Sequence, residues 1–158
     1  MKMITRTIAA SALAASLGPA QASDQEVVEA LYSKVLSGTA SPDLPARLAA
    51  VLSPDWQSLG DYSGTVKTRD QFLDQLQRIG AVAPGMRWKI EEILQVGNRY
   101  VVRGRATATP VGSFMGVAPT GRSFDIMAID IHTVENNRIV RSYHVEDWHG
   151  AIQQLQAK

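Results

Sequence analysis

Hydrophobic positions in the first third of the chain repeat every three or four residues. This spacing is typical of an amphipathic helix in residues 24–36, where the apolar positions are Val27, Val28, Leu31, Val35 and Leu36. Residues 44–53 predict a second, shorter helix. Residues 67–81 predict a third, because Thr68 is a good N-cap and Gly80 stands at the expected C-cap.

From residue 86 onward the repeat shortens to two, as in strands of a sheet. Four strands are predicted, the first with a slip in its alternation, at residues 86–96, 99–112, 122–134 and 138–147; residues 55–58 could add a short one. A last helix follows at residues 148–158, with Asp147 as its N-cap. Helices followed by a meander of strands and a short helix indicate the α+β class.

Alternation along the last two strands places Asp130 and His144 on a shared face. The turn at residues 135–137 makes these strands antiparallel neighbours, so Asp130 faces the region from Ser142 to His144. An aspartate and a histidine in reach of each other could form an acid/base pair, in which the carboxylate raises the pKa of the imidazole. They could equally be buried polar residues that satisfy each other.

Five further residues are candidates to bind a substrate. Arg103, on the second strand, could turn into a concave sheet and hold an anionic or carbonyl oxygen. Trp56, Gln57 and Tyr62 precede the third helix, and Trp88 lies on the first strand. Aromatic walls suit a flat organic ligand, although each such residue is more often ordinary core.

No cofactor or metal site is predicted. His144, Asp147 and His149 have the chemistry of metal ligands, but the change from strand to helix sends them in different directions. The sequence GVAPTG lacks the ending of a phosphate-binding loop, and no serine-hydrolase or zinc-protease motif is present.

Residues 1–22 have the order of a secretory signal peptide. Lys2 and Arg6 precede a short apolar run, and cleavage is expected after Ala22, which leaves one domain at residues 23–158. The run is shorter than the roughly 20 residues that span a bilayer, so no membrane span is expected. A secreted or periplasmic location is predicted.

Charge and cysteine content narrow the function further. The whole chain has 16 basic and 15 acidic residues; without residues 1–22 the balance is 14 against 15, a net charge of −1. No basic surface therefore argues for nucleic acid as a partner. Without cysteine, thiol catalysis and disulfides are impossible, and stability must come from packing.

Residues 112–155 resemble the SnoaL-like polyketide cyclases of the nuclear transport factor 2-like superfamily. The matching pieces are a Gly-x-Phe-x-Gly-x-x-Pro-Thr-Gly-Arg turn at residues 112–122, Ile-Asp-Ile at residues 129–131, and a terminal strand that ends in Asp147. The resemblance implies a cone-shaped barrel, in which a curved, mostly antiparallel sheet wraps N-terminal helices around a deep apolar pocket. It also implies a homodimer.

Relatives of this kind close a polyketide ring by intramolecular aldol condensation, without metal or cofactor, and use an aspartate on the terminal strand as acid/base. Where that strand usually reads His-Trp-Asp-Val, this chain has Ser-Tyr-His-Val, so His144 stands at the position of the aspartate. A histidine can still remove or return a proton near neutral pH.

Two functions are therefore expected. The first is an exported enzyme for aldol cyclisation or isomerisation next to a carbonyl, with His144 as acid/base, Asp130 orienting it, and Arg103, Gln57 or Tyr62 positioning the carbonyl oxygen. The second is a non-catalytic periplasmic module that holds a small apolar or aromatic ligand. An epoxide hydrolase built on Asp130 and Arg103 is a weaker third.

Overall fold

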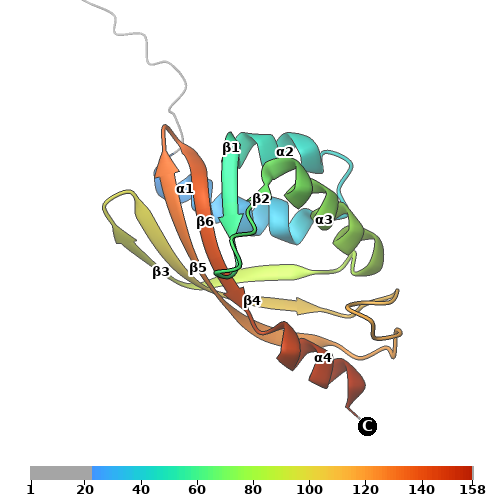
Figure 1. Cartoon of the computed structure of the whole chain (residues 1–158). Coiled ribbons are helices and arrows are strands. Elements are labelled where there is room, and N and C mark those ends of the chain that lie inside the picture. Colours follow the sequence, from blue (N-terminus) through green and yellow to red (C-terminus); the bar gives the residue numbers. More distant parts are fainter. Residues whose placement is uncertain (1–22, 158) are drawn as a thin grey trace, which may run out of the picture.

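The computed structural model describes residues 23–157. A strongly curved sheet is covered on one face by three helices, with a fourth at the end of the chain (Figure 1): α1 (Asp24–Ala30), α2 (Leu44–Val51), α3 (Arg69–Val82) and α4 (Trp148–Gln156). The predicted α+β class with a curved, mostly antiparallel sheet is confirmed. The predicted signal peptide lies outside the described residues.

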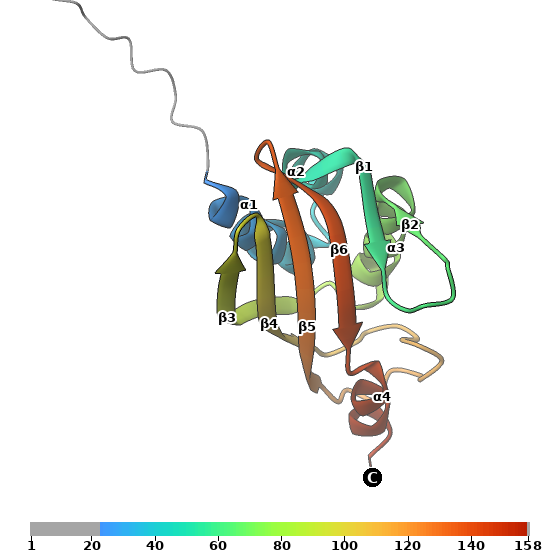
Figure 2. The same ribbon diagram turned by 60° about the vertical axis from the view of Figure 1, so that its left-hand side comes forward.

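The sheet has six strands in the order β2-β1-β6-β5-β4-β3, and it does not close into a barrel (Figure 2). Neighbouring strands are antiparallel except for β1 and β6, which are parallel. The strands are β1 (Leu52–Leu59), β2 (Lys67–Thr68), β3 (Arg87–Val96), β4 (Arg99–Ala108), β5 (Phe124–Glu135) and β6 (Arg138–Glu146). The short strand predicted at residues 55–58 is thus the centre of a longer one.

The first helix continues beyond α1 through a π-helical turn, η1 (Leu31–Val35), and a 3-10 turn, η2 (Leu36–Gly38). Its start is fixed by a capping box, in which Ser23 and Glu26 satisfy each other's backbone. The helical span predicted for residues 24–36 is confirmed. The π-helical turn has no signal in the apolar repeat, and such turns are frequent at functional sites.

The N-cap of α3 is confirmed, but its C-cap is not. The Thr68 side chain accepts a hydrogen bond from the backbone nitrogen of Gln71, and the Gln71 side chain accepts one from the backbone nitrogen of Thr68. Gly80 lies inside the helix instead of ending it, and a Cβ there would come within 2.3 Å of the carbonyl oxygen of Thr39. This glycine therefore allows helix and loop to pack closely, and α3 ends after Val82.

Two irregularities adjust the faces of the strands. The predicted slip on β3 is a bulge between Ile90 and Glu92. A register shift between Thr133 and Val134 of β5 pairs Val134 with Ile139 of β6, and Ile139 is buried in the core. Beyond that shift the predicted alternation holds, and Asp130 lies opposite His144.

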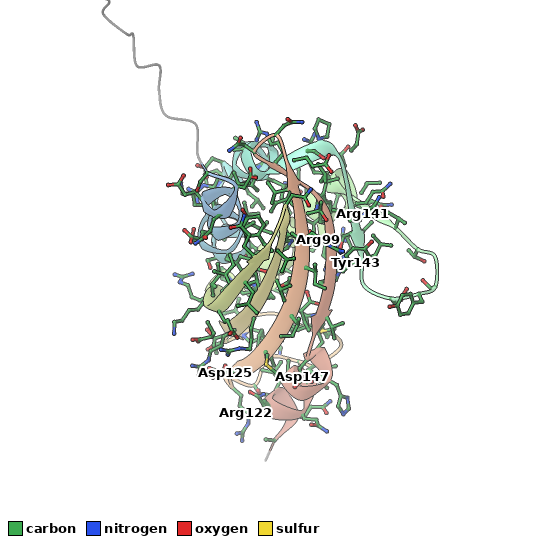
Figure 3. All side chains as sticks on the ribbon, turned by 90° about the vertical axis from the view of Figure 1, so that its left-hand side faces the viewer. Arg99, Arg122, Asp125, Arg141, Tyr143 and Asp147 are labelled. Carbon is green, nitrogen blue, oxygen red and sulfur yellow. The ribbon has the colours of Figure 1, made fainter. Side chains whose placement is uncertain are left out.

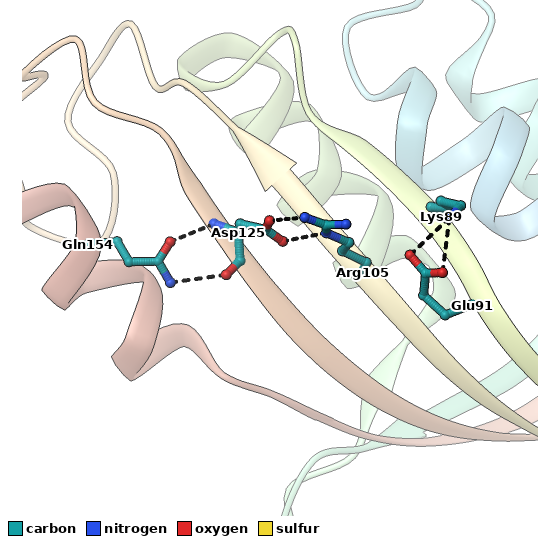
Figure 4. Close-up of polar contacts among 5 residues, drawn as sticks. All are labelled: Lys89, Glu91, Arg105, Asp125 and Gln154. Carbon is teal, nitrogen blue, oxygen red and sulfur yellow. Dashed lines mark hydrogen bonds and ion pairs between the residues drawn. The ribbon is translucent and has the colours of Figure 1, made fainter.

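The side chain of Gln154 attaches helix α4 to the sheet by hydrogen bonds to the backbone of β5 (Figure 4). Gln154 accepts a hydrogen bond from the backbone nitrogen of Asp125 at 2.8 Å and donates one to its carbonyl oxygen at 3.0 Å. The Asp125 carboxylate in turn pairs with Arg105 on β4. The predicted cap of α4 is confirmed, since Asp147 accepts from the backbone nitrogen of Gly150 at 2.9 Å.

The core has two parts. One lies between the first three helices and the sheet, and the other lies near α4 and centres on Phe114 and Phe124. Trp88 packs against both. Polar side chains meet a cavity between the two parts of the core, and that cavity is the candidate site.

Candidate active site

A small cleft inside the fold is lined by both polar side chains and aromatic rings. Its free volume is about 60 Å³. The polar lining comes from the first helix, α3 and three strands: Tyr32, Gln75, Ser58, Asp130, His132, Ser142, His144 and Glu146. The aromatic lining is Trp56, Phe72, Trp88 and Trp148. Strand alternation and the β5–β6 register bring most of the polar residues to one face of the sheet.

Five buried side chains form one continuous series of hydrogen bonds in this cleft. The Tyr32 hydroxyl donates to Asp130 Oδ2 at 2.7 Å and lies 2.9 Å from His132 Nε2. The other ring nitrogen, Nδ1, is 2.8 Å from Ser142 Oγ. Trp56 Nε1 donates to the same hydroxyl oxygen at 3.0 Å.

Asp130 is the carboxylate of this series. Its side chain is 7% exposed, and burial raises its pKa from 3.8 to about 7; the hydrogen bond from Tyr32 opposes this, Glu146 adds to it, and His144 opposes it. A carboxyl group with such a pKa can both take up and release a proton near neutral pH. Burial also raises the pKa of Tyr32 well above its ordinary value, so its hydroxyl stays a donor.

The pKa values of the two histidines of the cleft shift in opposite directions. Burial lowers the pKa of His132 to about 3, so this ring is neutral at neutral pH. His144 Nδ1 lies 2.8 Å from Glu146 Oε2, and this contact raises the pKa of His144. Protonation of His144 is therefore easier than that of a free imidazole, whereas His132 stays neutral.

Two larger cavities adjoin the cleft. An outer one of about 500 Å³ shares Gln75, Ile79 and Trp148 with it and is otherwise lined mainly by α3 and residues 113–115. A side cavity of about 190 Å³ shares Ser58 and His144 with the cleft and is lined also by Lys67 of β2 and by residues of the loop between β1 and β2. The cleft thus has a neighbouring cavity on the side of α3 and another on the side of β2.

Comparison with known proteins identifies the fold family. The sequence profile of the SnoaL-like polyketide cyclases matches residues 29–155. The chain belongs to the SnoaL-like polyketide cyclase family. Among curated proteins, no match to the chain was found.

Solved structures agree with this assignment. Wild-type IdmH from Streptomyces antibioticus, described as a candidate polyketide cyclase, superimposes with a TM-score of 0.71 and 28% identity over 84% of this chain and 97% of that one. A SnoaL-like protein from Jannaschia sp. CCS1 gives a TM-score of 0.73 at 18% identity, over 89% and 99% of the two chains. AclR from Streptomyces galilaeus, described as a candidate hydroxylase, gives 0.67 at 20%, over 84% and 97%. The last two likenesses concern the fold alone.

Four of the residues predicted for the site line the cleft: Asp130, His144, Trp56 and Trp88. Asp130 and His144 lie opposite each other on β5 and β6. Within residues 23–157, however, no hydrogen bond joins their side chains, because Asp130 binds Tyr32 and His144 binds Glu146. The residue that orients His144 is therefore Glu146.

The other three predicted residues lie away from the cleft. Arg103 points to the outer face of the sheet, where it pairs with Glu92 at 3.2 Å, because it alternates with the buried Val102. Gln57 is on the outer side of β1, with Arg141 3.3 Å away. Tyr62 is fully exposed in the loop before β2. None of the three can position a ligand oxygen beside Asp130 in this arrangement, and Arg103 cannot join Asp130 in an epoxide hydrolase site.

Three residues of the cleft have roles that the sequence alone did not assign. Tyr32 lies on the buried stripe of the first helix, where a polar-tipped aromatic residue among aliphatic ones is a weak signal. His132 and Glu146 share the inward face with Asp130 and His144, and alternation alone could have included them. Their partners are set by contacts across the fold.

The described part of the chain contains no group of three or more His, Asp or Glu side chains placed to hold a metal ion. Asp147 caps α4, and His149 is exposed beside Gln153. Within residues 23–157, no helix is long and apolar enough to span a membrane.

Proposed function

We propose that the protein is an enzyme that moves a proton next to a carbonyl group of a small organic molecule, as in aldol cyclisation or isomerisation. The observation that carries this proposal is Asp130, a carboxyl group buried at the wall of the cleft with a pKa of about 7. Buried titratable groups in clefts are typical acid/base residues. Family membership and the likeness to IdmH support the same class of reaction.

Asp130 is proposed as the acid/base, and His144 as the group that donates to the carbonyl oxygen. Glu146 holds Nδ1 of His144 and favours its protonated form, in which both ring nitrogens are donors. A donor aimed at an oxygen that gains negative charge stabilises the transition state more than the ground state. In this assignment His144 keeps a place in the mechanism, and the role of general base passes to Asp130.

The cavities suggest the shape of the substrate. The cleft of about 60 Å³ is far smaller than the roughly 300 Å³ of a typical ligand site, whereas the outer cavity of about 500 Å³ has that size. We therefore expect a molecule with a small carbonyl-bearing end in the cleft and a larger apolar or aromatic body in the outer cavity. Trp148, which lines both spaces, would contact the body.

The test compares Asp130→Asn and His144→Ala with Asp125→Asn, each assayed for turnover of an aldol-type carbonyl substrate. Asp125 is an exposed aspartate on the outer face of the same strand, and so it controls for loss of a carboxylate from β5. We expect Asp130→Asn to lose at least a hundredfold in kcat/KM, as is typical for loss of a general base. Unchanged turnover in Asp130→Asn would refute the proposal, and unchanged turnover in His144→Ala would remove His144 from the mechanism.

A non-catalytic binding module is the second candidate, and one observation favours it. Each polar group in the series from Trp56 to Asp130 already has a partner, as buried polar groups in purely structural roles do. Native mass spectrometry of the purified protein separates the two functions. A ligand that copurifies and is never converted supports the binding module.

We further propose that the protein is exported and dimeric. Export rests on the signal-like residues 1–22, and N-terminal sequencing of protein from the periplasm should begin at Ser23.

Dimerisation rests on the outer face of the sheet, whose side chains are seen in Figure 3 around Arg99 and Tyr143. There Ile129 and Val145 pair across two strands, and Val145 is 69% exposed. Light scattering should give the mass of a dimer for the wild type and that of a monomer for Val145→Lys. A monomeric wild type would refute the proposed dimer.

A further inference from the structure

The hydrogen-bonded series lies in the wall of the cleft and connects four elements of the fold. It joins β1, β6, β5 and the π-helical turn η1 through Trp56, Ser142, His132, Tyr32 and Asp130. All five residues are buried, with His132 only 2% exposed. Because the interior is closely packed, none of these side chains can change its partner without moving its neighbours.

The chemistry of the two ends sets the direction of every bond between them. The Trp56 indole can only donate, and an ionised Asp130 carboxylate can only accept. Tyr32 gives its only proton to Asp130, so it must accept from Nε2 of His132, and Nδ1 of the neutral ring is left without a proton. Ser142 accepts from Trp56 and donates its one proton to that Nδ1. Neutral His132 then carries its single proton on Nε2 and donates to Tyr32, and Tyr32 donates to Asp130 Oδ2. All four bonds point toward Asp130.

The two oxygens of Asp130 are therefore not equivalent. Oδ2 receives the end of the series, whereas Oδ1 receives no hydrogen bond from any residue between 23 and 157. In that part of the chain, Thr39 Oγ1 is the only fully buried side-chain polar atom that lacks a partner. Asp130 Oδ1 is thus not fully buried, and since Asp130 lines the cleft, Oδ1 opens to its free space.

We propose that Tyr32 and His132 are positioning residues for Asp130, and that the series from Trp56 keeps Oδ2 an acceptor, so that Oδ1 carries the proton exchanged with the substrate. This inference rests on the proposed role of Asp130 as acid/base. It also gives the neutral His132 a function. Its Nε2 donates to the Tyr32 hydroxyl, so that the single proton of Tyr32 is directed to Asp130 Oδ2. When Asp130 gains a proton on Oδ1, the rest of the series stays as it is.

Charged and titratable groups face Asp130 from each element packed around it. Tyr32 comes from the first helix, His132 from the same strand, and His144 and Glu146 from β6. Of these, Asp130 is expected to change charge near neutral pH, and the contact with Glu146 raises the pKa of His144. His132 and Tyr32 stay neutral there because burial disfavours their charged forms.

The direct test is the tautomer of His132, read from the nitrogen chemical shifts of the ¹⁵N-labelled wild-type protein between pH 5 and 9. We expect a proton on Nε2 and none on Nδ1 throughout this range, while the carboxyl carbon of Asp130 titrates. A proton on Nδ1, or a change of tautomer as Asp130 titrates, would overturn the inference. The measurement needs neither a variant nor a substrate.

Two serine variants provide a matched comparison. Ser142 and Ser58 pair across β6 and β1, and each is 4% exposed, but only Ser142 belongs to the series. In Ser142→Ala, His132 should become a mixture of the Nε2-protonated and Nδ1-protonated tautomers. In Ser58→Ala the tautomer should stay unchanged. Equal tautomer shifts in both variants would show that packing, and not the hydrogen bond, holds the ring.

Tyr32→Phe tests the link to the reaction. Loss of one hydrogen bond to a charged group corresponds to a fall of roughly tenfold to a hundredfold in kcat with little change in KM. The pKa of Asp130 should rise, because the bond from Tyr32 lowers it. An unchanged pH profile would refute the positioning role. Full turnover in Asp130→Asn would instead refute the proposed function, and the Nδ1-protonated tautomer would refute only this inference.

Discussion

Replacing Asp130 by asparagine should stabilise the protein at alkaline pH and leave it unchanged in acid. The folded state holds the Asp130 proton up to a pH of about 7, whereas the unfolded chain loses it near pH 3.8. Between these values only the folded state is protonated, so the contribution of Asp130 to stability falls as pH rises. Asparagine has the same shape, can accept from Tyr32 through its oxygen, and carries no charge to bury.

The magnitude follows from the pKa difference. Each pH unit between the two pKa values is worth about 1.4 kcal/mol, and the difference from 3.8 to about 7 spans roughly three units. The ionised wild type is therefore destabilised by up to about 4 kcal/mol at pH 8 relative to its protonated form. Asp130→Asn should recover most of this at pH 8 and almost none at pH 4. Gain of stability with loss of activity is a common trade-off at active sites.

Urea denaturation followed by tryptophan fluorescence, from pH 4 to pH 8, measures the effect. The quantity of interest is the difference in unfolding free energy between variant and wild type, in which the titrating groups that do not interact with Asp130 cancel. Asp125→Asn serves as the control and should show a small difference that is constant between pH 5 and 8, since its carboxylate is exposed. The reasoning would be refuted if Asp130→Asn were less stable than the wild type at pH 8, or if its gain in unfolding free energy did not grow with pH.

Four further variants test other parts of the structure by the same denaturation assay. His132→Asn should flatten the acid side of the stability profile, because burial lowers the pKa of His132 from 6.5 to about 3 and its contribution is lost as pH falls through that window; an equally steep profile would contradict this. Gly80→Ala should destabilise by about 2 kcal/mol, since a Cβ 2.3 Å from the Thr39 carbonyl oxygen outweighs the gain of about 1 kcal/mol in helix propensity. Gly85→Ala, with open space around it, should be nearly neutral. Thr68→Ala should cost about 1 kcal/mol through loss of the α3 cap, and no loss would show that the cap is dispensable.

The pairing of Asp130 with the His144 region could be predicted from the sequence because every contribution to it is local. Asn136 and Asn137 both adopt positive φ angles, a conformation that asparagine tolerates, and they make the tight turn between β5 and β6. Once the turn is set, alternation decides which residues share a face. The register of the two strands follows within one residue.

The partners of the same residues could not be predicted in this way. Tyr32 and Asp130 are 98 positions apart, and their contact depends on how the first helix packs across the sheet. Arg103 shows the opposite error: its charge suggested a ligand contact, but the alternation that buries Val102 turns Arg103 outward. Gly80 was expected to end α3, and only the approach of the Thr39 loop explains why a glycine is needed within the helix.

The sequence by itself determined the order of the main helices and strands, the N-caps of α3 and α4, and the face on which Asp130, His132 and His144 lie. These depend on periodicity and turn chemistry, which act over a few residues. The tertiary structure decided which of these residues carry charge and which hydrogen bonds they make. The reason is that burial and partner distance set the pKa of a group, and both arise only when helix and sheet pack together.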